Sequence, residues 1–395
     1  MTTYLTTKKE DTCYGCSACK HICPHSAINI EPNSEGFMYP KLDADKCVQC
    51  GLCVNVCPYD TPTKTTSTTS KTYAIQNKDN QSLMNSSSGG IFIAVAKWVL
   101  EQGGSVCGCV FDENFKATHV LTNEWDTVLA MQGSKYVQSD IGDMYPLIRS
   151  KLKSGQKVLF TGTPCQVAGL QKFLIKEYDN LITMDLICHG VPSPMLLESY
   201  LKEMASHRNG KILDFRFRHK KRNGWVSQGS ITIQANNGKQ TTKTTSPYQD
   251  SYYYYYYLAN NVSRECCYSC QYSSTTRYGD LTIGDYWNIA DVNVNFNTNQ
   301  GVSVVLVNTN KGQDVINAIK DFLNLAETPL ETAVQGNGNL HTPCERPASR
   351  DIIYKKIINQ GYKKTAEQEC HFSYILPTIK RMMPKWVKRI IKKVI

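Results

Sequence analysis

Seventeen of the 395 residues are cysteines, and eight of these lie in two evenly spaced runs near the start of the chain. The runs read CYGCSACKHICP and CVQCGLCVNVCP, and each ends in a cysteine followed by proline. Thiolates that one short loop brings together are good ligands for iron and zinc. Zinc favours two C-x2-C pairs, and a doubled run of four cysteines does not match that pattern.

Both runs have the ligand spacing of bacterial ferredoxins that carry two [4Fe–4S] clusters. Three thiolates in a tight loop bind three corners of one cube, and the fourth reaches across to the other cube. The sequence therefore predicts two clusters that exchange their fourth ligands and transfer single electrons. One ligand set is Cys13, Cys16, Cys19 and Cys57, and the other is Cys47, Cys50, Cys53 and Cys23.

The cysteine content also helps to predict whether the protein is secreted or cytoplasmic. A secreted protein would use many cysteines for disulfides, and it would begin with a signal peptide. This chain begins MTTYLTTKKEDT, without an apolar segment. It also lacks any apolar run of about 18 residues, the length that a spanning helix needs. We therefore expect a cytoplasmic protein whose cysteines are reduced metal ligands.

The net charge of +10 is concentrated at the C-terminus, where residues 380–395 hold seven basic and no acidic residues. The rest of the chain is close to neutral, so we expect no nucleic-acid partner. Within PKWVKRIIKKVI (384–395), apolar and basic residues fall on opposite sides of a helix, as in interfacial anchors on anionic lipid. The hypothesis is a peripheral contact with the inner face of the cell membrane. The alternative is a helix that docks on a partner or on the chain itself.

The elements that position these residues follow from hydrophobic periodicity. TPTKTTSTTSKT (61–72) has no periodicity and reads as a linker, and strands alternate with helices from Tyr73 onward, as in α/β domains. A helix is predicted within 86–104, and strands are predicted at 105–112, 157–162, 181–188 and 302–308. The expected domains are 1–60 (ferredoxin), 61–72 (linker), 73–325 (larger α/β domain) and 326–395 (C-terminal extension).

Two junctions in the larger domain have the composition of phosphate-binding loops. They are residues 85–90 (NSSSGG) and residues 161–163 (TGT), and each precedes a predicted helix. Hydroxyl and free N–H groups at a helix N-terminus favour an anion. Helix capping explains serine and threonine there equally well, so both interpretations stay open.

Several of the remaining cysteines also follow strands. Cys165 and Cys188 come at the ends of two predicted strands, where ligands gather in α/β sheets. A C-x2-C pair would complete a four-thiolate site, either Cys267 with Cys270 or Cys266 with one of them. The alternative is buried cysteines with a local zinc or redox pair. Core packing is expected for at least one of the alternating strand cysteines 107 and 109, and no role is predicted for Cys344 and Cys370.

Six ordered segments resemble one family, and the resemblance covers roughly residues 1–320. The segments are NSSSGG (85–90), MQGSKYVQS (131–139), FTGTPCQVAGL (160–170), DLICHGVPSP (185–194), CYSC (267–270) and GDLTIGDYW (279–287). They resemble the coenzyme F420 hydrogenase/dehydrogenase beta-subunit family, here fused behind a ferredoxin domain. The implied fold class is α+β: a ferredoxin domain, a larger α/β flavoprotein-like domain and a C-terminal helical tail.

The resemblance implies two cofactors beyond the ferredoxin clusters. One is a third [4Fe–4S] cluster on Cys165, Cys188, Cys267 and Cys270, which leaves Cys266 as a neighbour. The other is FAD. Lys135 would then face the flavin pyrophosphate or flavin N1, and the alternative is an ordinary surface lysine. The implied flavin contacts are Ser86, Ser87, Ser88, Gly89, Gly90, Gly133, Ser134, Lys135, Tyr136, Thr161, Gly162 and Thr163.

Three further features stay open on sequence alone. In FRFRHKKRNGW (215–225), Arg216, Arg218 and Lys221 could attract an acidic hydride acceptor such as F420, or form a solvated strand face. His189 is either a proton donor or a packed neighbour of Cys188. The run YYYYYY (252–257) is predicted to be a helix with tyrosines packed on both faces.

The function expected is that of an iron–sulfur flavoprotein oxidoreductase. Single electrons would pass through the [4Fe–4S] clusters, pair on FAD and leave to F420 or another hydride acceptor. The partner would be a redox protein or a small hydride carrier. A role in surface-polysaccharide metabolism is a further hypothesis, and the alternative is a non-enzymatic electron-carrier subunit of a larger complex. The sequence predicts no oligomeric state.

Overall fold

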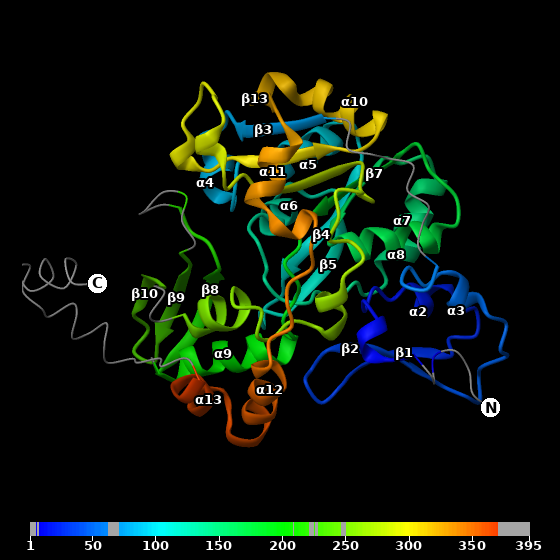
Figure 1. The fold of residues 1–395 in the computed structure, drawn as a ribbon, viewed down its shortest axis with the longest axis vertical. Helices are drawn as coiled ribbons and strands as arrows, with labels where there is room; N and C mark the ends of the chain where they lie inside the picture. The colour runs from blue at the N-terminus through cyan, green and yellow to red at the C-terminus, as the bar shows by residue number, and fades with distance from the viewer. Residues whose placement is uncertain are drawn as a thin grey trace, which may run out of the picture.

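The computed structural model describes residues 5, 8–61, 71–207, 209–220, 225, 228–245 and 250–369 (Figure 1). Three predicted features therefore lie outside the described residues: most of the linker, Lys221 and the basic helix at 384–395. Cys370 lies outside them as well. Among the helices that are described, none is both long and apolar enough to cross a membrane.

The N-terminal part is a small domain built on the two cysteine runs. Strands β1 (Ile28–Pro32) and β2 (Met38–Leu42) form an antiparallel pair. Helix α2 (Ala18–Ile22) begins inside the first run, and helix α3 (Leu52–Asn55) begins inside the second. This domain lies beside helices α7 and α8 of the larger domain, as the blue and green segments of Figure 1 show.

The larger domain is organised around one mixed sheet of eight strands. Four neighbouring strands are parallel, and the outer ones are antiparallel. In spatial order the strands are β13 (Leu323–Thr328), β3 (Lys71–Asn77), β12 (Ser303–Val307), β11 (Leu281–Asp285), β7 (Leu181–Leu186), β6 (Val158–Gly162), β4 (Ser105–Phe111) and β5 (Ala117–Thr122). The four predicted strands are confirmed within two residues at each end. The predicted α+β class is also confirmed.

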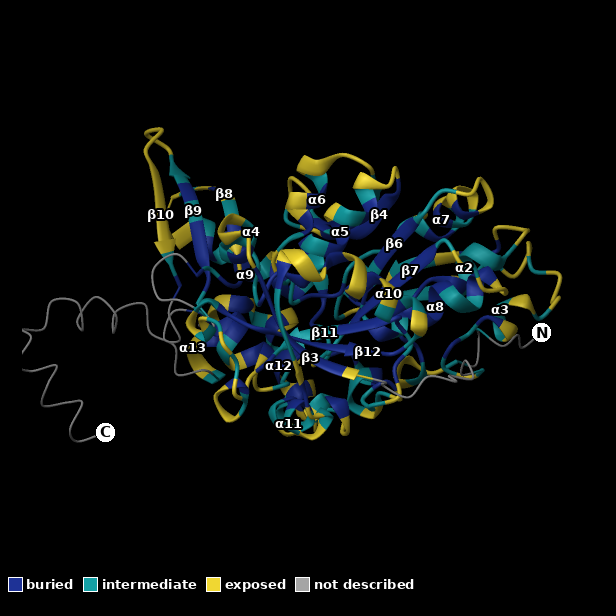
Figure 2. Cartoon of the chain, turned by 90° about the horizontal axis from the view of Figure 1, so that it is seen from above, coloured by how far each residue is buried: buried dark blue, intermediate teal, exposed yellow. Residues whose placement is uncertain are grey.

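Helices cover both faces of this sheet, so its central strands are buried (Figure 2). Helices α5 (Ile91–Glu101), α6 (Trp125–Met131) and α10 (Asn310–Ile319) share one core with the strands. Helices α7 (Met144–Lys153) and α8 (Pro164–Leu174) pack on the other face, where Cys107 is fully buried as core packing predicted. Two short helices, α4 (Asn80–Asn85) and α11 (Leu330–Gly336), lie near the β3 edge. The helix predicted within 86–104 begins only at Ile91, because Gly90 has a φ of 81°.

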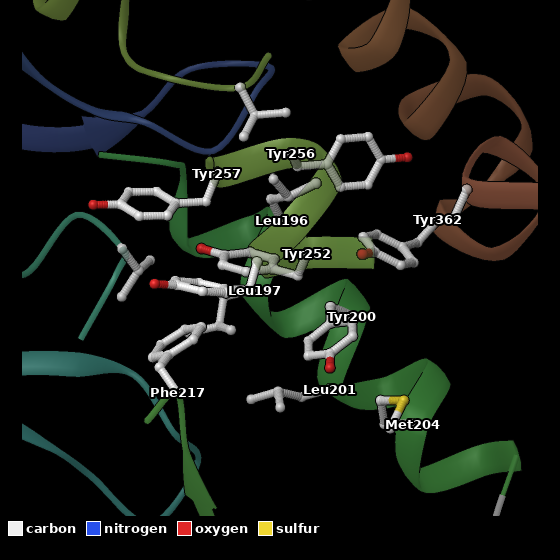
Figure 3. Close-up of a cluster of buried hydrophobic side chains, with 14 of the residues drawn as sticks. Leu196, Leu197, Tyr200, Leu201, Met204, Phe217, Tyr252, Tyr256, Tyr257 and Tyr362 are labelled. Carbon is white, nitrogen blue, oxygen red and sulfur yellow. The ribbon is translucent and has the colours of Figure 1, made fainter. Parts of the chain in front are cut away.

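A third group of elements forms its own core. It contains the sheet β8 (Gly210–Arg216), β9 (Ser230–Ala235) and β10 (Gln240–Thr244), with helices α9 (Pro194–His207), α12 (Ser349–Gln360) and α13 (Tyr362–Glu369). The tyrosine run forms a π-helix at Ser251–Tyr257. Tyr252, Tyr253, Tyr256 and Tyr257 are buried. Figure 3 shows Tyr252, Tyr256 and Tyr257 among Leu197, Tyr200, Phe217 and Tyr362. The predicted helix is therefore confirmed, with its tyrosines packed around most of its circumference.

Candidate functional site

Five cysteines line one cavity at the carboxyl ends of β6 and β7. They are Cys165, Cys188, Cys266, Cys267 and Cys270. They come from three separate segments of the chain, and more than a hundred residues of sequence lie between the first and the last of them. The predicted convergence of the two strand ends on the CYSC loop is thus present in the structure.

Local geometry explains how each segment reaches the cavity. Pro164 starts α8, where a missing N–H costs nothing, and Cys165 follows it in the first turn. The backbone N–H of Thr163 donates to Gln166 Oε1 at 3.0 Å, as in a capping box. The Thr163 hydroxyl lies 3.1 Å from the Cys165 sulfur. Capping therefore accounts for Thr163, and the same residue also contacts the predicted iron ligand.

The CYSC segment is a short 3-10 helix, Glu265–Ser269. An antiparallel bridge between Pro192 and Ser263 anchors the chain just before it. Arg264 N–H donates to the Val191 carbonyl at 2.9 Å. The loop after β7 and the CYSC loop are therefore held side by side, which brings Cys188 near Cys267.

The electrostatics of the cavity disfavour free thiolates. Burial raises the pKa of Cys165 well above that of an ordinary thiol, and Cys188, Cys270 and Cys267 raise it further. Burial also raises the pKa of Cys270 to about 11. Four sulfurs that repel one another's charge in this cavity would need bound cations to become thiolates together.

Among the described residues, no three His, Cys, Asp or Glu side chains converge on a position for a single metal ion. A [4Fe–4S] cube makes a different demand, because each thiolate bonds a different iron and the sulfurs surround the whole cube. The cavity offers four such sulfurs from three segments. Its donor set therefore fits a cluster.

A second cavity lies in the ferredoxin domain. Its lining includes Cys13, Cys16, Cys19 and Cys57, which is one of the two ligand sets predicted from the spacing. The inclusion of Cys57 matches the expectation that the fourth thiolate comes from the other run. In the other set, Cys47 and Cys50 lie close enough to raise the pKa of Cys53, after the larger effect of burial.

The two cavities share a wall. Tyr14 and Gly15 line both of them. The Tyr14 ring lies 5.4 Å from the ring of Tyr59 and 5.1 Å from that of Tyr272, measured between centroids. The first cysteine run of the ferredoxin domain is therefore packed directly against the five-cysteine cavity.

Two of the predicted flavin loops lie against each other. The Ser134 N–H donates to Ser87 Oγ at 2.8 Å, and Gln132 Nε2 donates to Ser86 Oγ at 3.0 Å. Ser88 Oγ donates to the Val302 carbonyl at 2.7 Å, which ties the loop to the start of β12. Segments 85–90 and 131–139 thus form one surface, although nearly fifty residues separate them in sequence.

Two glycines allow neighbouring segments to lie close together around this surface. A Cβ at Gly89 would lie 2.0 Å from the Ile75 carbonyl oxygen, so only glycine fits beside β3. A Cβ at Gly108 would lie 2.7 Å from Met131 Sδ and 3.1 Å from Thr161 Cγ2. The side chains of Thr161, at the end of β6, and Met131 therefore meet on the same side of β4 at Gly108.

Lys135 has partners that the sequence did not reveal. Its ammonium donates to the carbonyls at the C-terminal end of α6, at 3.1–3.3 Å. Burial lowers its pKa to about 8. Lys135 is thus neither a freely solvated surface lysine nor a cation without partners, and it stabilises the helix that precedes the loop.

The basic segment 215–220 divides into two environments. Arg216 is exposed on β8 beside Asp214, at 3.3 Å, as the solvated-face interpretation expected. Arg218 is buried and pairs with Asp285, which also accepts from Trp225 Nε1 at 3.1 Å. For Arg218 the solvated-face interpretation is therefore wrong.

Three residues near the site had no clear sequence signal. Lys220 is buried, and its ammonium donates to the Leu83 carbonyl at 2.9 Å and to the Ser88 carbonyl. Cys344 lies 3.8 Å from the Cys267 carbonyl. Arg264 lines the five-cysteine cavity and is fully buried. Their importance depends on long-range contacts, and only the nearby motifs pointed to this region.

His189 lines the five-cysteine cavity beside Cys188. Burial lowers its pKa, and the carboxylate of Asp285 opposes that effect. A mostly neutral imidazole at this position can donate or accept one proton. Both interpretations made from the sequence, proton donor and packed neighbour, remain compatible with this environment.

Two parts of the chain match models of known protein families. Residues 12–61 match the 4Fe-4S dicluster domain. Residues 155–332 match the family described as the C terminus of the coenzyme F420 hydrogenase/dehydrogenase beta subunit. No curated protein matches the chain.

A similar solved structure is a chain of the F420-reducing [NiFe] hydrogenase complex from Methanosarcina barkeri, studied after xenon derivatization. Its sequence identity is 18% and its TM-score is 0.43, over 77% of this chain and 93% of that chain. The family resemblance predicted from six ordered segments is confirmed by the matching family model. The chain thus contains a segment that matches a 4Fe–4S dicluster domain, followed by a segment similar to the C terminus of the coenzyme F420 hydrogenase/dehydrogenase beta subunit, and both segments indicate iron–sulfur redox chemistry.

Proposed function

We propose that the chain is an iron–sulfur flavoprotein oxidoreductase with three [4Fe–4S] clusters and one FAD. The observation that carries this proposal is the wall that two cysteine-lined cavities share at Tyr14 and Gly15. Clusters bound on the two sides of such a wall would lie close enough for direct electron transfer. The ferredoxin domain would then pass electrons into the larger domain without any change of shape.

Four cysteines are the proposed ligands of the third cluster: Cys165, Cys188, Cys267 and Cys270. The support is their presence in one buried cavity and their mutual effect on pKa. Cys266 is buried beside them and shares a hydrogen bond with Cys267 that raises the pKa of Cys267. We assign Cys266 to packing and hydrogen bonding, because Cys267 with Cys270 provides the C-x2-C pair.

The proposed flavin site is the surface formed by residues 85–90 and 133–136, with Thr161, Gly162 and Thr163 nearby. When bound, FAD supplies the conversion between one-electron and two-electron transfer. Lys220 supports an anion here, since its buried ammonium lies beneath the 85–90 loop and burial lowers its pKa to about 7. A phosphate near this loop would offset the cost of burying that charge.

The proposed acceptor is F420 or another carrier that takes up a hydride. Arg218 and Asp285 would position it, and His189 would hold or release a proton beside Cys188. Arg218 supports an anionic acceptor, because two of its guanidinium nitrogens have no hydrogen-bond partner among the described residues. The link to surface-polysaccharide metabolism rests on the family resemblance alone and stays a hypothesis.

Metal and flavin analysis of anaerobically purified protein tests this function. We expect about twelve irons per chain, four for each cluster, and an FAD spectrum. The variant Cys165→Ser should lose about four irons. Its matched control is Cys107→Ser, at a buried cysteine of the sheet core, which should keep all its iron. About eight irons without flavin would instead support an electron-carrier subunit.

The proposed membrane contact of residues 384–395 needs a separate test. Full-length protein should sediment with anionic vesicles, and a chain that ends at residue 383 should not. Equal sedimentation of the two chains, or none with either, would refute the anchor and leave the redox proposal unaffected.

A further inference from the structure

Arg264 is a fully buried cation without a carboxylate partner. Its Nε donates to the Cys13 carbonyl at 2.8 Å, and its Nη1 donates to the Met38 carbonyl at 3.0 Å and to Gln138 Oε1 at 3.3 Å. Nη2 has no hydrogen-bond partner among the described residues. Its guanidinium carbon lies 3.8 Å from the centre of the Tyr39 ring. All of these contacts are to neutral groups.

The other buried arginines of the described chain differ in this respect. Arg277 pairs with Asp185 at 2.9 Å, Arg350 pairs with Glu35 at 2.6 Å, and Arg218 pairs with Asp285. Each of these charges is neutralised where it is buried. Among the buried arginines of the described residues, only Arg264 has no acidic partner.

An arginine cannot escape this situation by losing its proton, because its pKa is too high. A charge taken out of water is costly unless an opposite charge compensates it. The fold therefore requires an anion near Arg264 in the working protein. The described side chains offer no carboxylate within ion-pair distance, so the anion must come from a bound group or from ionised thiols.

The position of Arg264 identifies that anion. Its guanidinium contacts the backbone of Cys13, and its side chain lines the cavity that holds Cys266 and Cys267. A Cβ at Gly15 would lie 3.1 Å from Arg264 Nη1, so the guanidinium also touches the wall between the two cavities. A [4Fe–4S] core bound by four thiolates carries a net negative charge, and one such site lies on each side of this residue.

We propose that Arg264 is the counter-charge shared by the first ferredoxin cluster and the third cluster, and that it raises the reduction potentials of both. Reduction adds one electron to a cluster and makes it more negative, without making or breaking a covalent bond. A fixed cation stabilises the reduced form more than the oxidised form. For the third cluster this inference rests on the proposed function, whereas the ferredoxin cluster belongs to the confirmed dicluster domain.

The first test is Arg264→Met in the full-length, iron-loaded protein. Redox titration followed by electron paramagnetic resonance gives the potential of each cluster. At a fixed solution potential, we expect the ratio of reduced to oxidised cluster to fall about tenfold at both sites. This corresponds to a reduction potential that is lower by about 59 mV for one electron. Arg264→Lys, which keeps the charge, should restore most of the ratio. Unchanged potentials in Arg264→Met would overturn the proposal.

A second variant tests the charge without removing the side chain. Gln138→Glu keeps the oxygen that accepts from Arg264 and from the Met38 N–H, both at 3.3 Å. It places a carboxylate beside the guanidinium and should lower both potentials in the same direction. Because the shape is nearly unchanged, this variant should fold even if Arg264→Met does not assemble. Wild-type potentials in Gln138→Glu would also overturn the proposal.

The control is the double variant Glu35→Gln/Arg350→Met. This pair joins the ferredoxin domain to helix α12, and the double variant removes one charge of each sign, so the net charge of the chain stays the same. We expect lower stability and unchanged potentials. Potentials that fall equally in this control would show a structural effect and overturn the electrostatic role. Iron analysis distinguishes the proposed third cluster from the proposed role of Arg264. About eight irons per chain, with a ferredoxin potential that still shifts in Arg264→Met, would refute the third cluster and leave the role of Arg264 at the ferredoxin cluster in place.

Discussion

Gly169 of α8 sets how closely the ferredoxin domain can approach the larger domain. A Cβ at this position would lie 2.8 Å from Cys16 Cβ and 3.0 Å from Cys16 Sγ. It would also lie 3.0 Å from the Tyr145 hydroxyl. Cys16 is a predicted iron ligand in a short loop, so its Cβ cannot move without moving the cluster site. We therefore expect Gly169→Ala to push the two domains apart.

The expected size follows from two opposing terms. Alanine in place of a helical glycine would stabilise α8 by about 1 kcal/mol. Overpacking a tight site costs about 1–3 kcal/mol. We expect a cost in the upper part of that range, because the added Cβ would lie 2.8 Å from Cys16 Cβ and the Cys16 side chain cannot rotate away. The net expectation is a loss of about 1–2 kcal/mol, from the same two terms.

Thermal unfolding of the iron-loaded protein measures this loss. The apparent Tm should fall by about 2–4 °C for each kcal/mol in a domain of this size. The control is Gly338→Ala, since a Cβ at Gly338 meets no atom within 4 Å. An unchanged or higher Tm in Gly169→Ala, with Gly338→Ala as reference, would refute the claim that the two domains are in tight contact here.

Two other predictions concern buried charges in the larger domain. Asp185→Asn should destabilise the chain by about 3–5 kcal/mol in chemical unfolding, because Arg277 would lose the carboxylate that it contacts at 2.9 Å; a loss below about 1 kcal/mol, the range of exposed pairs, would contradict this. Burial lowers the pKa of His119 from 6.5 to about 4, so the unfolded chain binds a proton more readily and wild-type stability should fall as the pH drops from 6.5 to 4, by about 3 kcal/mol. His119→Gln should show a flatter pH profile over that range, and an identical slope in the two proteins would be inconsistent with a buried neutral His119.

The cysteine positions show what sequence spacing can predict. The repeat placed Cys57 with Cys13, Cys16 and Cys19, and the structure gathers these four around one cavity. That prediction was possible because two-cluster ferredoxins with this spacing exchange their fourth ligands between the two runs. The site on Cys165, Cys188 and the CYSC loop could not be predicted from spacing alone. The sequence left open which two of Cys266, Cys267 and Cys270 complete the site, and it left open a local zinc or redox pair.

The contacts of Lys135 and Lys220 could not be predicted from the motifs around them. The resemblance implied that Lys135 faces the flavin pyrophosphate or flavin N1, and the structure shows its ammonium on the last carbonyls of α6. The end of that helix, two residues before the glycine, was not predictable from the motif. Lys220 reaches the 85–90 loop from a segment more than a hundred residues away, and no pattern within that segment marks it as buried.

Arg264 is a stronger case of the same limit. In the sequence it is one basic residue before a glutamate and two cysteines, and no role was predicted for it. Its partners are the Cys13 and Met38 carbonyls and Gln138, which come from three other parts of the chain. A missing counter-charge can be recognised only when every neighbour is known.

The contacts between the two domains bear on how electrons would move. The predicted linker at 61–72 would allow the ferredoxin domain to swing, yet three separate contacts hold that domain in place. Cys16 packs against Gly169, Arg264 binds the Cys13 carbonyl, and Arg350 binds Glu35. In the proposed function, electrons would therefore cross the wall at Tyr14 and Gly15 without domain motion.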